Sequence, residues 1–202
     1  MNRHTNTMPP SPEEYHLVVK KENRSSKFLV TSNSGSNEFI DFSATKGFKI
    51  YMVAFDDMLG SIVYVGITKR SMKERFTSGF GSIDDKNIYS WATSAGSYRL
   101  LVWDLSNIVK DSIELEVVEA ELAFAVRVMQ RWWPTGLKSI TFKYFQMSNA
   151  IMASSVIARN MIEQYFDILR SRNELSGDDL EKIEFQKHKI IILLEELSIC
   201  RG

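Results

Sequence analysis

The chain has 202 residues, a hydrophobic content of 44% and 25 basic against 25 acidic residues, so its formal net charge is zero. It is long enough for one domain with a sizeable core, but it lacks a whole-molecule positive field that would attract nucleic acid. Its one cysteine, Cys200, excludes an internal disulfide or a cysteine-based zinc site and favours a reducing, cytoplasmic location. A membrane span needs about 18 consecutive apolar residues, and the sequence has no such run.

The first 46 residues are rich in Ser, Asn, Thr and Pro, and residues 31–37 have the sequence TSNSGSN. This composition is typical of loops and flexible segments. Two apolar stretches, 15–19 and 28–30, could form short strands. We therefore expect residues 1–46 to form an N-terminal arm that is flexible in part.

Three apolar stretches rich in β-branched and aromatic residues follow the arm. They are residues 48–55 (FKIYMVAF), 61–66 (SIVYVG) and 98–105 (YRLLVWDL). Each is predicted to be a strand, and the turn-like sequence DDMLG between the first two predicts a hairpin. We expect these strands to form a small three-stranded antiparallel sheet.

A short helix is predicted after Ser71, because Ser71 followed by Glu74 is the pattern of a capping box. This helix carries Lys73 and Arg75. The sheet and its flanking helices predict an α/β (α+β) fold. The expected organisation is an arm at residues 1–46, a core at 47–138 and a helical extension at 139–202.

Longer helices are predicted in the second half of the chain. Asp111 followed by Glu114 repeats the capping pattern, and the helix that it opens should run to about Trp133, because Pro134 follows. Further helices are expected at residues 148–172 and 176–198. Residues 174–202 hold seven acidic and four basic side chains, a net charge of −3, which favours a protein contact there over a DNA contact. We therefore expect these C-terminal helices to serve target recognition or homodimer formation.

The order of motifs in the core resembles that of a known enzyme family. The KIY of residues 49–51 and the YVG of residues 64–66 resemble the paired motif of the GIY-YIG nucleases. Residues 64–76 resemble the second strand and first helix of that family, and the VEAEL of residues 118–122 resembles its glutamate helix. The resemblance covers about residues 47–138.

The resemblance implies a metal-dependent endonuclease, expected to be of the restriction type, that hydrolyses phosphodiester bonds of double-stranded DNA. It implies that Tyr51 activates the water and that Tyr64 orients the water or the phosphate. It also implies that Arg75 stabilises the charge of the transition state and that Glu119 binds one Mg²⁺ or Mn²⁺ ion. Lys69 would be a second cation near the phosphate.

The residue types suit this chemistry. Arg75 can hold a phosphate through two donors at once. Glu119 follows Leu115 by four residues and precedes Leu122 by three, so it borders the apolar stripe of its helix. A carboxylate there is costly unless it binds a metal or pairs with a cation such as Arg75. Glu121 is the alternative metal ligand, because its helical neighbours are also apolar.

Some positions depart from the family pattern. Lys49 stands where the first motif has glycine, and Leu137 stands where the family commonly has asparagine. Two alternatives to the nuclease therefore remain: an inactive nucleic-acid-binding module of the same fold, and an unrelated α/β protein-interaction domain. Additional phosphate contacts are expected from the basic residues Arg70, Lys73, Arg99 and Lys138.

Overall fold

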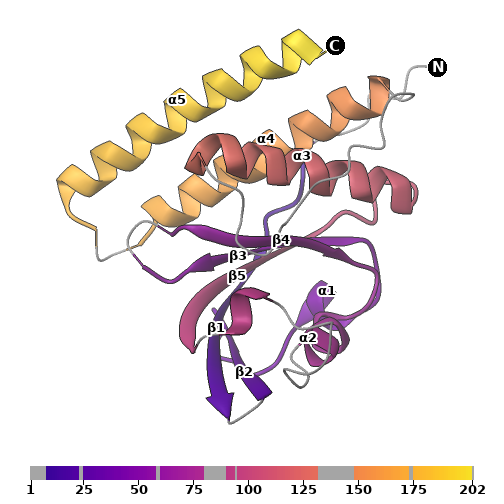
Figure 1. Ribbon diagram of the computed structural model, residues 1–202, viewed down its shortest axis with the longest axis vertical. Helices are drawn as coiled ribbons and strands as arrows, with labels where there is room; N and C mark the ends of the chain where they lie inside the picture. Colours follow the sequence, from indigo (N-terminus) through magenta and orange to yellow (C-terminus); the bar gives the residue numbers. More distant parts are fainter. Residues whose placement is uncertain are drawn as a thin grey trace.

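The computed structural model describes residues 8–22, 25–57, 60–79, 90–93, 95–131, 148–172 and 175–201. An antiparallel sheet lies between a layer of long helices and a layer of short ones (Figure 1). The strands are β1 (Glu13–Glu22), β2 (Ser25–Ser32), β3 (Lys49–Phe55), β4 (Ile62–Thr68) and β5 (Gly96–Asp104). The helices are α1 (Asp41–Ala44), α2 (Met72–Gly79), the 3₁₀ helix η1 (Ser90–Thr93), α3 (Ser112–Gln130), α4 (Ser148–Arg170) and α5 (Gly177–Arg201).

The sheet has five strands in the order β2-β1-β5-β3-β4, so the expectation of three strands is wrong. The three predicted core strands are β3, β4 and β5, while β1 and β2 come from the segment expected to be an arm. β1 pairs with β5, where Leu17 lies opposite Tyr98. Tyr15, Leu17 and Val19 alternate along β1 and are buried, which is the period of a strand with one face in a core. This burial, together with pairing to the open edge of β5, holds β1 in the sheet.

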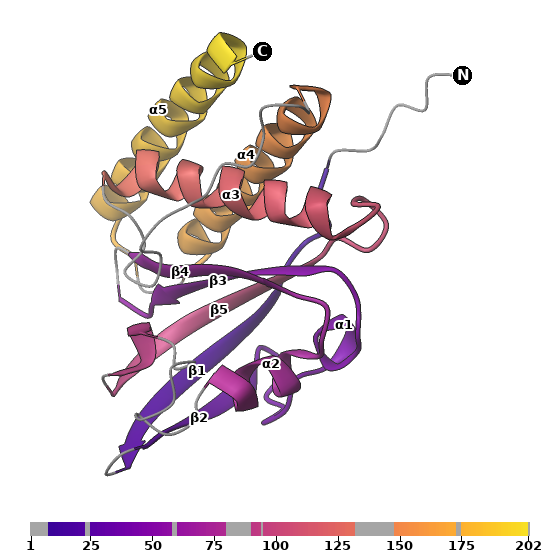
Figure 2. The same cartoon turned by 45° about the vertical axis from the view of Figure 1, so that its right-hand side comes forward.

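The two faces of the sheet pack against different helices. Ile50 and Met52 of β3 belong to a core shared with α3, α4 and α5, whereas Tyr51 and Val53 belong to a core shared with α2 and η1. Figure 2 shows the long helices on one side of the sheet and α1 and α2 on the other. Tyr51 therefore faces α2, and this alternation decides on which side of the sheet the first motif residue lies.

The predicted helix starts are confirmed by their caps. The Ser71 hydroxyl accepts the Glu74 N–H at 3.2 Å, and the Glu74 carboxylate accepts the Ser71 N–H at 3.1 Å. Asp111 caps α3 by accepting two N–H groups of the first turn. α3 ends at Gln130, earlier than expected, because Arg131 takes a left-handed conformation with φ of 68°.

The helical extension is packed against the core. Buried residues of α4 and α5, among them Met161, Tyr165 and Leu194, join the apolar cluster under α3. The expected boundary at residue 138 lies outside the described residues. None of the helices in the described part of the chain combines the length and the apolar character needed to cross a bilayer.

Candidate active site

The β3–β4 hairpin brings the two motif tyrosines together over a glycine. Tyr51 lies opposite Gly66, and its ring centroid is 5.8 Å from that of Tyr64. A Cβ atom on Gly66 would lie 2.5 Å from a ring carbon of Tyr64 and 2.8 Å from the hydroxyl oxygen of Tyr51. These distances are too short for any side chain, so the glycine of the second motif makes room for both rings.

The regular register of β4 with β3 places Tyr64 on the side of Tyr51, and a β-bulge follows at Val63. Val53 lies opposite Tyr64, but the next residue of β3, Ala54, lies opposite Ile62, so β4 has one extra residue at Val63. As a result Ile62 belongs to the core under the long helices, while Tyr64 packs against the core on the α2 side. Without the bulge, residues two apart on a strand would share one face.

Helix α2 places Arg75 beside the two tyrosines. Its Nε donates a hydrogen bond of 3.0 Å to the hydroxyl oxygen of Tyr51. The next residue, Phe76, is fully buried, with its ring centroid 5.9 Å from that of Tyr51. Phe76 thus anchors the helix in the core and Arg75 lies along the hydroxyl end of Tyr51. Tyr51 itself is fully buried, whereas Tyr64 and Arg75 are partly exposed.

Glu119 lies in the other helical layer of the molecule. It lies on α3, which covers the opposite face of the sheet from α2, and β4 is the last strand at this edge. Burial raises the pKa of Glu119 to about 7, and the nearby charge of Glu116 adds to this rise. The charge of Arg75 and a hydrogen bond from the Ile67 N–H of β4 both lower the pKa of Glu119. The four residues that the family resemblance selects therefore converge at the open edge of β4.

The donors at this edge suit one hard cation. Mg²⁺ is commonly held by one or two carboxylates, while water and phosphate oxygens fill its other positions. Glu119 supplies one carboxylate and Glu116, close enough to affect its pKa, is the other acid nearby. A divalent cation would also stabilise the charged form of Glu119, which burial disfavours. Within the described ranges no group of three or more His, Cys, Asp or Glu side chains could hold a metal ion, so most ligands here would be water or phosphate.

Glu121, the alternative ligand, does not share this position. It is only 3% exposed and lies two residues further along α3, which turns it by more than half of a helical turn away from Glu119. The charge of Arg75 lowers the pKa of Glu119. The geometry therefore favours Glu119 as the residue that could hold the ion.

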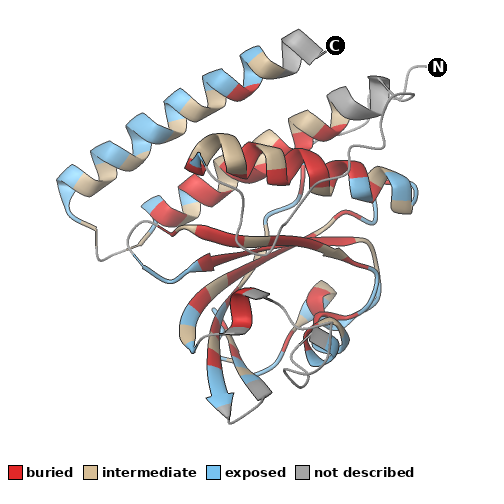
Figure 3. Cartoon of the chain, in the orientation of Figure 1, coloured by how far each residue is buried: buried red, intermediate tan, exposed pale blue. Residues whose placement is uncertain are grey.

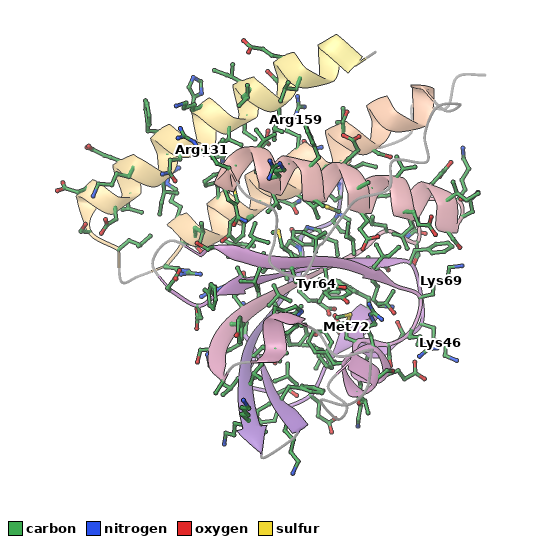
Figure 4. The ribbon with its side chains drawn as sticks, in the orientation of Figure 1. Lys46, Tyr64, Lys69, Met72, Arg131 and Arg159 are labelled. Atoms are coloured by element: carbon green, nitrogen blue, oxygen red, sulfur yellow. The ribbon has the colours of Figure 1, made fainter. Side chains whose placement is uncertain are left out.

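The basic residues near the group differ in their surroundings. Lys69 directly follows β4 and places its Nζ 5.3 Å from the centre of the Phe48 ring. Figure 4 shows Lys69 at the outer margin and Tyr64 deeper, beneath β4. Arg70 is exposed, and Lys73 is exposed at the wall of a cavity of about 550 Å³ between β2 and α2. All three lie on or next to α2, so they could reach a phosphate chain that passes the group.

One of the expected nucleic-acid contacts, Arg99, is not brought to this group. Arg99 forms ion pairs with Glu14 at 2.9 Å and Asp56 at 3.3 Å. It alternates along β5 with Leu100, which lies in the core on the α2 side, so Arg99 lies on the opposite face of the sheet. Lys138 lies outside the described residues.

Lys49, which stands where the first motif has glycine, has a structural role. Lys49 is 1% exposed, and its Nζ donates a hydrogen bond of 2.7 Å to the Thr45 carbonyl just after α1. Burial lowers its pKa, and the charges of Asp104 and Glu13 oppose that shift. Lys49 therefore ties the segment after α1 to the sheet and leaves β3 intact at Tyr51. Leu137 lies outside the described residues.

Sequence reasoning missed the packing role of Gly66 and the contribution of Glu116. A glycine inside an apolar strand is itself a signal of close approach by another group. Glu116 lies one helical turn before Glu119 and so shares its side of the helix. Both signals are present in the sequence. Neither of them shows which residues Gly66 or Glu116 would lie against until the pairing of β3 with β4 is known.

The chain matches no protein-family model, no curated protein and no solved structure, so this site rests on its own geometry.

Proposed function

We propose that this protein is a metal-dependent endonuclease of the GIY-YIG type that hydrolyses phosphodiester bonds of double-stranded DNA. The supporting observation is the convergence of Tyr51, Tyr64, Arg75 and Glu119 from four elements at one sheet edge. An arginine beside phenol groups and a carboxylate matches the needs of phosphodiester hydrolysis, which are charge stabilisation, an oriented water and a place for a cation.

In this proposal Arg75 stabilises the charge that develops on the phosphate in the transition state. Tyr51 accepts the hydrogen bond from its Nε and thereby fixes the guanidinium in one orientation. Because Tyr51 is fully buried, the partly exposed Tyr64 is the phenol that an attacking water can reach. This assigns the orientation of the water to Tyr64 and changes the role expected for Tyr51 from the resemblance.

Glu119 would hold Mg²⁺ or Mn²⁺. A bound cation would neutralise phosphate charge and make a coordinated water more acidic. The Ile67 N–H fixes the carboxylate at the edge of β4, and Arg75 lies close enough to oppose its protonation. Lys69 and Arg70 would add phosphate contacts that strengthen binding without selecting a base sequence.

The test is cleavage of plasmid and genomic DNA with Mg²⁺, with Mn²⁺ and with chelator, for the wild type and for Glu119→Gln, Arg75→Lys, Tyr64→Phe and Tyr51→Phe. We expect metal-dependent cleavage that falls at least about 100-fold in the Glu119 and Arg75 variants. A matched control is Glu38→Gln, an exposed carboxylate outside the group, which should cut like the wild type. Equal cutting by all of these variants would place the activity elsewhere.

A second candidate function is an inactive nucleic-acid-binding module with the same fold. The full burial of Tyr51 favours it, because no water reaches that phenol in this conformation. Filter binding to duplex DNA, single-stranded DNA and RNA separates the two candidates. Binding with no cleavage of any substrate would support the module, and cleavage that depends on Glu119 would rule it out.

A further inference from the structure

Helix α5 has two faces with different surroundings. Its inner face includes Ile190 and Leu194, which pack against the core under the long helices. Among the described residues, three ion pairs tie α5 to α4: Lys187 with Asp167 at 2.6 Å, Glu195 with Arg159 at 2.6 Å, and Glu184 with Arg170 at 3.2 Å. The inner face therefore fixes the orientation of α5 on the molecule and leaves its outer face in solvent.

The outer face carries a continuous stripe of exposed side chains, the outer stripe. Each member has another member three or four residues away, so they lie along one side of the helix. They are Asp178, Glu181, Lys182, Phe185, His188, Lys189, Ile192 and Glu196, all exposed. Figure 3 shows this side of α5 as exposed along most of its length. Phe185 is 70% exposed and Ile192 is 42% exposed, and such apolar groups on one stripe are typical of a contact surface.

The charges around Phe185 are arranged symmetrically. Glu181 precedes Phe185 by four residues and Lys189 follows it by four, so the acid and the base flank the ring at equal distances along the helix. A twofold axis through Phe185 would bring Glu181 of each copy against Lys189 of the other. A surface that is complementary to itself in this way is what a twofold dimer requires.

We propose that α5 pairs antiparallel with α5 of a second copy, with the two Phe185 rings in contact and two Glu181–Lys189 ion pairs on either side. The paired length is roughly 25 Å of helix. This dimer does not depend on the reaction proposed above. It would place two copies of the β4-edge site on one particle.

Other arrangements of the same helices are less complementary. Parallel pairing would set Glu181 against Glu181 and Lys189 against Lys189. An antiparallel register with Phe185 opposite Ile192 would set Glu181 against Glu196. Only the register centred on Phe185 joins the aromatic contact with two opposite-charge pairs.

The first test is sedimentation velocity of the full chain over a range of concentrations. We expect a dimer for the wild type and a monomer for Phe185→Asp. Phe185 is largely exposed, so its replacement should leave the fold of each chain unchanged by circular dichroism. The matched control is Ile113→Asp, which changes a 56% exposed residue on α3 and should stay dimeric. A monomeric wild type, or a dimeric Phe185→Asp variant, would overturn the proposal.

The second test is charge reversal within the outer stripe. Glu181→Lys and Lys189→Glu should each raise the dimer dissociation constant at least tenfold, and the double variant should restore it to near the wild-type value. These residues are about 12 Å apart along the helix, so they cannot compensate for each other within one chain. Glu196→Lys, on the same stripe but without a Lys189 opposite, should have little effect. Failure of the double variant to recover would refute the register.

Discussion

Gly66 lies opposite Tyr51 and beside Tyr64, and a single added carbon there would meet both rings. We expect Gly66→Ala to push the tyrosines apart, which would lower cleavage at least tenfold and destabilise the fold by about 1–3 kcal/mol. Denaturant unfolding and a cleavage assay on the same preparations measure the two effects. The control is Gly177→Ala, because a Cβ atom there meets nothing within 4 Å. A fully active Gly66→Ala variant would contradict the packing described here.

Glu119 makes stability depend on pH. Burial raises its folded-state pKa to about 7 from an ordinary value of 4.5, so between these values the folded chain holds a proton that the unfolded chain has released. The free energy of unfolding of the metal-free protein should therefore fall, by on the order of 2 kcal/mol from this group, as pH rises from about 4.5 to 7. Glu119→Gln should remove that decrease. Denaturant titrations in chelator at several pH values measure this decrease, and identical pH profiles for the two proteins would count against a raised pKa of Glu119.

For individual residues, the order of chemical groups along the chain selects the members of the candidate site but not their contacts. Tyr51, Tyr64 and Arg75 are close in sequence, and a hairpin followed by a capped helix brings them together with local rules alone. The choice between Glu119 and Glu121 depends on how α3 is rotated over the sheet edge. That rotation is set by tertiary packing, which helical periodicity does not specify.

Helix α2 holds Arg75 in place through its cap and through Phe76. Ser71→Ala removes the acceptor for the Glu74 N–H and should destabilise the protein by about 1 kcal/mol. Because the first turn would fray, we also expect weaker cleavage. The control Thr77→Ala changes an exposed residue on the same helix and should alter unfolding by less than about 0.5 kcal/mol. Equal stability of the two variants would show that the cap does not hold the helix.

At the element scale, the start of α2 and that of α3 follow from short-range patterns, because a capping side chain bonds to backbone groups only two or three residues away. The length of the strands β1 and β2 was underestimated, because it depends on contacts with residues far away in the sequence. Their polar ends, such as Lys20 and Lys21, continue the ladder only because partner strands lie beside them. Neighbours that are distant in sequence decide strand length, and composition alone favoured a flexible arm.

At the scale of the whole molecule, β1 is part of the core. Leu17 has no exposed surface and packs in the cluster that also holds Tyr51. Leu17→Ala should therefore reduce the free energy of unfolding by about 2–5 kcal/mol, a value typical of core positions. The exposed Leu29 on β2 is the control, and its replacement by alanine should cost far less. Equal, small effects of both replacements would indicate that residues 13–22 form an arm and are not part of the core.

The β4 edge joins groups from two layers that are synthesised at different times. The tyrosines and Arg75 belong to the first 75 residues. Glu119 reaches its position only after α3 has been synthesised and the later helices have packed it against the sheet. A nascent chain that has folded its hairpin and α2 thus carries Arg75 without the carboxylate of Glu119. Loosening of the helical layer in the finished protein would have the same effect. In the proposed endonuclease, such late assembly would keep partly folded chains from cutting the genome of the cell that makes them.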